Sequence, residues 1–269
     1  MKKKVQINNE SIESIVKKDY KEALVEYILN AFEANATEVA IVSTLNPLGG
    51  VDEIKIIDNG TGIDHSALSQ TFESFLSSNK QPLLKPISFG RNKGRGRYSF
   101  ISFANSATWQ TTYADKDKLF SYTIKINALT KDYVEFDEKV KDVTDKEAST
   151  GTVVTLQGIS TLSKESMDFT QIEKPLLNAF ASFLYLKKSK SYKITIDDKP
   201  LDYTKFIDPE LSEDRMLIID DQEFIAYFVK WIDNIKSRYF FYFLDAASRE
   251  KYNKHTKFNN NACTVMVIT

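Results

Sequence analysis

The sequence EYILNAFEANA, residues 26–36, carries the pattern that organises the rest of the chain. A helix over Ala23–Glu33 would gather its apolar side chains on one side, namely Leu24, Ile28, Ala31 and Phe32. Glu26, Asn30 and Glu33 would then lie on the other side, at positions i, i+4 and i+7. Taken alone, this pattern is typical of a surface helix with a solvated polar face.

The residues around this helix extend the pattern. Asp19 predicts the start of the helix, because Glu22 follows it at the spacing of a capping box. A β-rich run at residues 39–44 and an apolar run at residues 54–57 come after the helix. The second run ends in DNGTG, residues 58–62, where two glycines bracket a sharp turn. Two later segments complete the succession, GRNKGRG at residues 90–96 and GTVVT at residues 151–155.

This succession resembles the GHKL ATPase family, which includes DNA gyrase B, the large heat-shock chaperones, histidine kinases, the mismatch-repair protein MutL and the MORC proteins. Members carry an ExxxN helix, a DxGxG turn, a GxxGxG lid and a later Gly-Thr…Thr strand. Here the motifs read Glu26-x-x-x-Asn30, Asp58-x-Gly60-x-Gly62, Gly90-x-x-x-Gly94-x-Gly96 and Gly151-Thr152…Thr155. Each motif alone is common, whereas four in this order are specific. The resemblance covers roughly residues 15–160.

The resemblance implies an α+β fold of the Bergerat type, a sandwich in which a mixed, mostly antiparallel sheet has helices on one face. We expect an ATP-binding domain at residues 1–162 and a smaller α/β domain, similar to the transducer of MutL and MORC proteins, at residues 163–269. The chain stops in an apolar, strand-like run, so we expect the second domain to be truncated. The periodicity predicts strands within residues 107–157, a helix at Ile172–Lys187, and further strands at residues 192–196, 223–233 and 238–244.

For the reaction, the resemblance assigns Asn30 to Mg²⁺ and Glu26 to activation of the attacking water. Mg²⁺ prefers hard oxygen ligands and keeps several waters, so one amide oxygen together with the phosphates suffices. A carboxylate can orient a water molecule and accept its proton. Relatives that only pass phosphate to a histidine often lack this glutamate, so Glu26 favours hydrolysis. Glu33 stands where many relatives have aspartate, and a capping or surface role is the alternative for it.

For the adenine base, the resemblance assigns Asp58 as the acceptor of a hydrogen bond from the amino group. Gly60 and Gly62 would allow close approach of the backbone to the base and unusual φ angles. Thr155 matches the threonine that supports the adenine site. The alternatives are a plain Asp-Asn-Gly turn between strands and a β-branched strand residue.

The glycine-rich segment would form an ATP lid that contacts the phosphates. The residues predicted for this role are Lys80, Lys93, Gly94, Arg95 and Gly96. No Gly-Lys-Ser/Thr follows, so the segment is not a P-loop. The alternative is a nucleic-acid contact patch made by Lys93, Arg95 and Arg97. In the second domain, Lys257 is a candidate for the transducer lysine that reaches the γ-phosphate, with a solvated loop lysine as the alternative.

The composition excludes several classes of protein. The net charge of −1 gives no bulk attraction to nucleic acid or membrane, and no run approaches the apolar length of a transmembrane helix. The two histidines have no metal-ligand spacing, so zinc chemistry is not expected. A single cysteine cannot form an internal disulfide and suggests a cytoplasmic location.

The sequence thus predicts a slow ATPase that uses ATP and Mg²⁺. Lid closure and hydrolysis would drive a conformational or dimerisation cycle of a larger protein, with an ATP-dependent homodimer and nucleic-acid or protein clients as the expected partners. The alternative is a non-hydrolysing ATP-sensing or nucleic-acid-associated scaffold module. Glu26 distinguishes these two hypotheses, because a protein that binds ATP without hydrolysing it does not need this carboxylate.

Overall fold

The computed structural model describes residues 2–4, 19–68, 96–145, 147–188, 191–232, 240–244, 250–255 and 263–268. The chain forms two compact units. The first takes the described residues up to Ile172 together with Lys193–Pro200, and the second takes Glu173–Tyr192 and the described residues from Leu201 onward. No helix among these residues is long and apolar enough to span a membrane.

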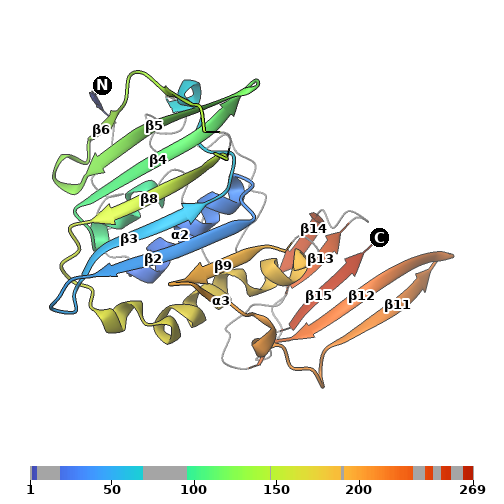
Figure 1. The fold of residues 1–269 in the computed structure, drawn as a ribbon. Coiled ribbons are helices and arrows are strands. Elements are labelled where there is room, and N and C mark those ends of the chain that lie inside the picture. Colours follow the sequence, from blue (N-terminus) through green and yellow to red (C-terminus); the bar gives the residue numbers. More distant parts are fainter. Residues whose placement is uncertain are drawn as a thin grey trace. The chain divides into compact units, whose positions relative to one another are not determined.

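A ten-stranded sheet forms the first unit (Figure 1). Its strands are β1 (Lys2–Lys4), β2 (Glu38–Leu45), β3 (Val51–Asp58), β4 (Ser106–Asp115), β5 (Lys118–Asn127), β6 (Tyr133–Phe136), β7 (Lys141–Val143), β8 (Gly151–Gln157), β9 (Lys193–Ile196) and β10 (Lys199–Pro200). The order is β1-β6-β5-β4-β8-β3-β2-β9-β10, and β7 pairs with β5. Only β2 and β9 pair in parallel among the described strands of this sheet. The mostly antiparallel sheet confirms the predicted α+β class.

Helix α2 (Tyr20–Glu33) lies on one face of this sheet (Figure 1). The side chain of Asp19 accepts a hydrogen bond from the backbone N–H of Lys21, which confirms the predicted cap. The helix ends where Asn35 adopts a φ of 61° and the N–H of Ala36 reaches the carbonyl of Ala31 at 3.0 Å. This ending turns the chain directly into β2.

The core of the first unit follows the period of the strands. Alternate residues are buried on the face that carries α2, and they include Val39, Ile41, Ile54, Ile56, Ala107, Trp109, Ile124, Ile126, Val154 and Leu156. Leu24 and Ile28 of α2 are fully buried, as the helical pattern predicts. The described residues of this unit also form four short 3₁₀ helices: η1 (His65–Ala67), η3 (Gly96–Ser102), η4 (Ala128–Thr130) and η5 (Lys164–Met167).

The second unit contains a five-stranded sheet and most of helix α3 (Phe169–Leu186). The strands are β11 (Glu213–Ile219), β12 (Gln222–Lys230), β13 (Phe240–Leu244), β14 (Glu250–His255) and β15 (Cys263–Ile268), in the order β11-β12-β15-β13-β14. A short 3₁₀ helix, η7 (Thr204–Phe206), precedes them. Helix α3 and strands β12 and β13 lie where the sequence predicts them, whereas β11 was not expected.

One predicted strand lies in the large sheet and not in the second domain, where we expected it. We predicted the strand at residues 192–196 as the opening of the second domain, but β9 runs parallel to β2 in the large sheet, with Lys193 opposite Glu38 and Ile196 opposite Ile41. Ile194 and Ile196 are buried there, so the large sheet gains apolar burial by taking this strand. The division of the chain at residue 162 stays a prediction.

Candidate nucleotide-binding site

Glu26, Asn30 and Gly96 lie together, although the sequence separates them widely. Glu26 and Asn30 are one turn apart on α2, and Gly96 begins η3. A methyl group on Gly96 would lie 2.8 Å from Oε2 of Glu26 and 3.4 Å from Nδ2 of Asn30. Glu26 is only 7% exposed, whereas Asn30 is exposed. The surface-helix interpretation is therefore wrong for Glu26, whose carboxylate is covered rather than solvated.

The turn at residues 58–62 is attached to the end of the same helix. The N–H of Thr61 donates to the carbonyl of Ala34, the C-cap of α2, at 2.8 Å. A methyl group on Gly60 would lie 2.7 Å from that carbonyl oxygen and 2.9 Å from Oδ1 of Asp58. Glycine is required at position 60 for this close approach, and its φ is not positive.

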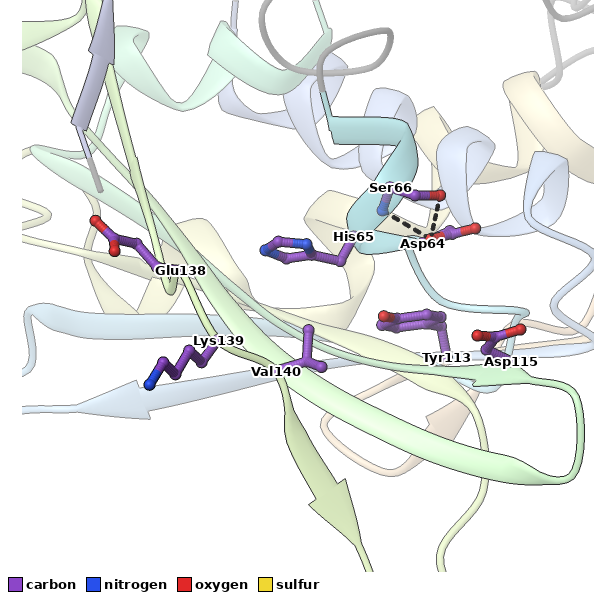
Figure 2. Close-up of a pocket in the computed structure, with 8 residues that line it drawn as sticks. All are labelled: Asp64, His65, Ser66, Tyr113, Asp115, Glu138, Lys139 and Val140. Carbon is purple, nitrogen blue, oxygen red and sulfur yellow. Dashed lines mark hydrogen bonds between the residues drawn. The ribbon is translucent and has the colours of Figure 1, made fainter.

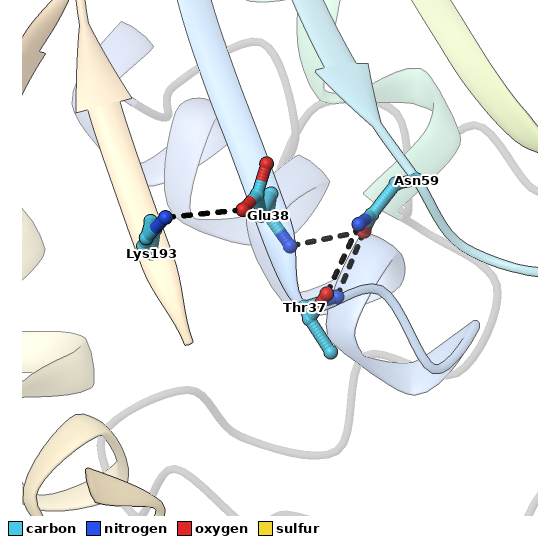
Figure 3. Close-up of polar contacts among 4 residues, drawn as sticks. All are labelled: Thr37, Glu38, Asn59 and Lys193. Carbon is cyan, nitrogen blue, oxygen red and sulfur yellow. Dashed lines mark hydrogen bonds and ion pairs between the residues drawn. The ribbon is translucent and has the colours of Figure 1, made fainter. Parts of the chain in front are cut away.

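Asn59 anchors the turn at residues 58–62 to the start of β2 (Figure 3). Its Oδ1 accepts hydrogen bonds from the N–H groups of Thr37 at 2.8 Å and Glu38 at 2.9 Å. Its Nδ2 donates to Oγ1 of Thr37 at 3.0 Å. Glu38 also pairs with Lys193 of β9 at 3.3 Å. The turn is thus fixed to the start of β2, and β2 is fixed to β9.

Gly62 packs against β4. Its φ is +71°, a conformation that L side chains rarely adopt, and a methyl group there would overlap the carbonyl oxygen of Thr112. The next residue, Ile63, donates its N–H to Oγ1 of Thr111 at 2.9 Å. The unusual φ predicted for Gly62 is therefore present, whereas its close approach is to the backbone of β4, and an approach to the adenine base stays a prediction.

Asp58 ends β3 at this turn, and its side chain is half-buried. Its Oδ1 accepts a hydrogen bond from the N–H of Gly60 at 2.8 Å. Burial raises the pKa of Asp58, and hydrogen bonds from the backbone of Gly60 and Thr152 partly oppose that rise. A carboxylate in this setting is a strong acceptor for a ligand N–H.

The threonine beside Asp58 is Thr152, not Thr155. Thr152 stands opposite Asp58 in the β3–β8 pairing, is 7% exposed, and lies with its Oγ1 3.1 Å from Oγ1 of Thr111. Thr155 pairs with Lys55 and Thr108 and alternates onto the opposite, less buried face of β8. A signal was present in the sequence, because the buried period of β8 includes Val154 and Leu156 and therefore position 152.

A link from α2 to η3 was not predicted. The hydroxyl of Tyr27, the residue after Glu26, donates to the carbonyl of Arg97 at 3.4 Å. Arg97 is half-buried, and burial lowers its pKa. This position does not favour the nucleic-acid contact that we considered for Arg97. The other predicted phosphate contacts, Lys80, Lys93, Gly94 and Arg95, and the transducer candidate Lys257, lie outside the described residues.

The described residues contain no group of three or more His, Cys, Asp or Glu side chains that could hold a metal ion by themselves. The arrangement that fits Mg²⁺ is of another kind. An exposed amide oxygen such as that of Asn30 is a hard ligand of the kind that Mg²⁺ accepts alongside phosphates and water.

The chain is similar to a known protein family and to solved structures. The family model described as histidine kinase-, DNA gyrase B-, and HSP90-like ATPase matches residues 18–161, over half of the chain. Among solved structures, the chain is similar to the MutL ATPase domain of Aquifex aeolicus complexed with ADP, with a TM-score of 0.47 and 10% identity over 92% of this chain and 90% of that one. It is also similar to the N-terminal domain of a DNA repair protein, with a TM-score of 0.48 and 13% identity over 96% of this chain and 86% of that one.

No curated protein sequence matches the chain. The family match spans α2, the turn at residues 58–62, η3 and β8, which are the elements that bring Glu26, Asn30, Asp58 and Gly96 into one unit. The chain therefore belongs to the family of histidine kinase-, DNA gyrase B- and HSP90-like ATPases.

Proposed function

We propose that this chain binds ATP with Mg²⁺ in its first unit and hydrolyses the ATP slowly. The observation that carries the proposal is the position of Glu26 and Asn30 against the backbone of Gly96. A covered carboxylate beside an exposed amide, facing a residue without a side chain, suits a phosphate chain and an attacking water.

In this proposal Glu26 and Asn30, which both lie on α2, have different roles. Asn30 would hold Mg²⁺ through its amide oxygen. When bound, Mg²⁺ supplies positive charge that offsets the charge on the phosphates. Glu26 orients the attacking water and accepts its proton. Its burial beside Gly96 limits the positions that the carboxylate can take, which favours a single orientation of that water.

Adenine binds beside the C-terminal end of α2. Asp58 accepts a hydrogen bond from the amino group of the base, and guanine presents an acceptor at the matching position, so the carboxylate excludes it. Thr152, opposite Asp58 on β8, takes the supporting role that the sequence suggested for Thr155. Gly60 and Gly62 let the turn pack closely against the carbonyl oxygens of Ala34 and Thr112, beside Asp58.

The slow rate follows from the need to close the site before reaction. We propose that Lys80, Lys93, Gly94 and Arg95 contact the phosphates as part of a lid. Closure and hydrolysis would drive a conformational or dimerisation cycle of a larger protein. Protein or nucleic-acid clients would bind regions outside this chain.

A calorimetric titration with ATP, with and without Mg²⁺, tests the nucleotide site. We expect magnesium-dependent binding to the wild type and loss of binding in Asp58→Asn. Asp52→Asn is a matched control, because Asp52 is an exposed carboxylate at the opposite end of the same strand. Absence of binding by folded wild type, or equal binding by Asp58→Asn, would contradict the proposal. Binding without any release of phosphate would leave a non-hydrolysing ATP-sensing module.

A further inference from the structure

A cavity of about 590 Å³ lies on the first unit, apart from Glu26 and Asn30. Three segments line it (Figure 2): residues 64–66 at η1, the end of β4 with Tyr113 and Asp115, and the loop at residues 138–140. None of the lining residues belongs to the proposed ATP site. The cavity therefore offers a second place for a ligand.

The lining is rich in negative charge. Asp64, Asp115 and Glu138 contribute carboxylates, and Lys139 is the only lysine or arginine among the lining residues. Oδ1 of Asp64 accepts hydrogen bonds from the N–H and the hydroxyl of Ser66, both at 2.8 Å, which fixes this carboxylate at the start of η1. A positively charged group would be attracted here.

Two of the lining residues pack against an aromatic ring whose hydroxyl is buried. The ring of Tyr122 stands edge-on to two lining residues, with ring centroids 4.9 Å from His65 and 6.0 Å from Tyr113. Tyr122 is 2% exposed, and its hydroxyl has no hydrogen-bond partner within the part of the chain that the structure describes. Burial, followed by the charges of Tyr113 and Asp64, raises the pKa of Tyr122, so its hydroxyl stays protonated. A buried hydroxyl in this state is costly unless a ligand or water meets it.

The walls of the cavity are also tied to one another. Nε2 of His65 lies 3.0 Å from the carbonyl oxygen of Asp137, next to the loop at residues 138–140. The ring contacts of His65 with Tyr122, and of Tyr122 with Tyr113, join η1 to β4. All three lining segments are thus connected through His65, and the cavity does not depend on a single exposed loop.

We propose that this cavity binds an organic cation that carries a guanidinium or alkylammonium group. The carboxylates attract the charge, and the face of Tyr113 adds a cation–π contact. The hydroxyl of Tyr122 contributes a further hydrogen bond to the ligand or to a water that it orders. The cation is either a free amine or the side chain of a basic residue in a partner protein.

Proton NMR of His65 provides the test, because the chain contains only two histidines and His255→Asn assigns the remaining imidazole signal. The probes are agmatine, a free guanidinium amine, and N-acetyl-arginine methylamide, which represents an arginine side chain in a protein. N-butylurea is the neutral control. We expect saturable shifts of the His65 signals with one or both cations and none with the urea. Agmatine alone would identify a free amine, and binding of the capped arginine would identify a protein side chain.

Four variants test the proposed binding site: two in the lining, one at the buried tyrosine and one control. Asp115→Asn and Glu138→Gln should each weaken binding about tenfold, whereas Asp117→Asn, an exposed turn residue outside the lining, should bind like the wild type. Melting curves confirm that each variant is folded. No saturable shift with either cation, equal binding of the urea, or wild-type binding by both lining variants would overturn the proposal. Wild-type binding by Tyr122→Phe would remove the hydroxyl from it.

Discussion

The carboxylate of Glu26 lies directly over the backbone of Gly96, so that a methyl group on that glycine would come within 2.8 Å of Oε2. This contact joins the helix that carries the proposed general base to the first described residue after position 68. Because the neighbouring atom is the end of a flexible side chain, a methyl group can be accommodated if the carboxylate moves. The position of that carboxylate is what the proposed reaction needs.

Gly96→Ala should therefore impair turnover more than folding. We expect the rate of phosphate release to fall at least about tenfold, because a small displacement of a catalytic group is costly. The melting temperature should change little, since no backbone atom blocks the methyl group. The measurement is kcat from phosphate release together with a melting curve. An unchanged kcat would show that the exact position of the Glu26 carboxylate does not limit the rate.

Replacing Glu26 with glutamine should separate binding from chemistry. Glutamine keeps the size of the buried side chain but cannot accept the proton, so we expect turnover to fall by about 100-fold or more. ATP affinity measured by calorimetry should stay within a few-fold of the wild type. Glu22→Gln is the control, because Glu22 is an exposed carboxylate in the first turn of the same helix. Equal turnover in Glu26→Gln and Glu22→Gln would remove Glu26 from the mechanism.

Thr152→Val and Thr155→Val form a matched pair on one strand. Thr152 is buried next to Thr111 and Asp58, so loss of its hydroxyl should weaken ATP binding about tenfold and lower the free energy of unfolding by about 1 kcal/mol. Thr155 lies on the opposite face, and its replacement should change neither quantity appreciably. Calorimetry and urea unfolding measure both effects. A stronger effect at Thr155 would restore the assignment made from the sequence.

The positions of Thr152 and Thr155 in the structure illustrate what a sequence pattern can and cannot predict. Local spacing correctly predicted α2, its Asp19 cap and the glycine turn, because each depends on residues close together in the chain. The choice between Thr152 and Thr155 depends on which face of β8 meets Asp58, and strand register decides that. The motif spacing included both threonines and gave no register.

Other contacts join residues that are too far apart in the sequence for a local pattern to predict. The link from Tyr27 to Arg97 spans seventy residues, and that from Asn59 to Thr37 spans twenty-two. The pairing of β9 with β2 is parallel and joins residues on either side of α3. The periodicity of a sequence does not identify residues that pair over such long separations, because burial in the folded sheet determines this pairing. These contacts hold the motif residues at their observed positions.

The raised pKa of Asp58 predicts a dependence of stability on pH. The folded protein binds a proton at Asp58 more readily than the unfolded chain, because burial disfavours the charged carboxylate. Stability should therefore fall as pH rises from the ordinary pKa of aspartate through the raised one, and the cost should persist at neutral pH. Asp58→Asn keeps an oxygen for the N–H groups of Gly60 and Thr152 but carries no charge.

We accordingly expect Asp58→Asn to match or exceed the wild type in stability at neutral pH, with the advantage shrinking toward about pH 4. ATP binding should behave in the opposite way. It should be lost in the variant at every pH, and in the wild type it should weaken as acid protonates Asp58, since a protonated carboxyl group no longer offers two acceptors to the adenine amino group. Urea unfolding and calorimetry across this pH range measure the two trends. A variant that is less stable than the wild type at neutral pH and gains relative stability in acid would show that the charge of Asp58 stabilises the fold.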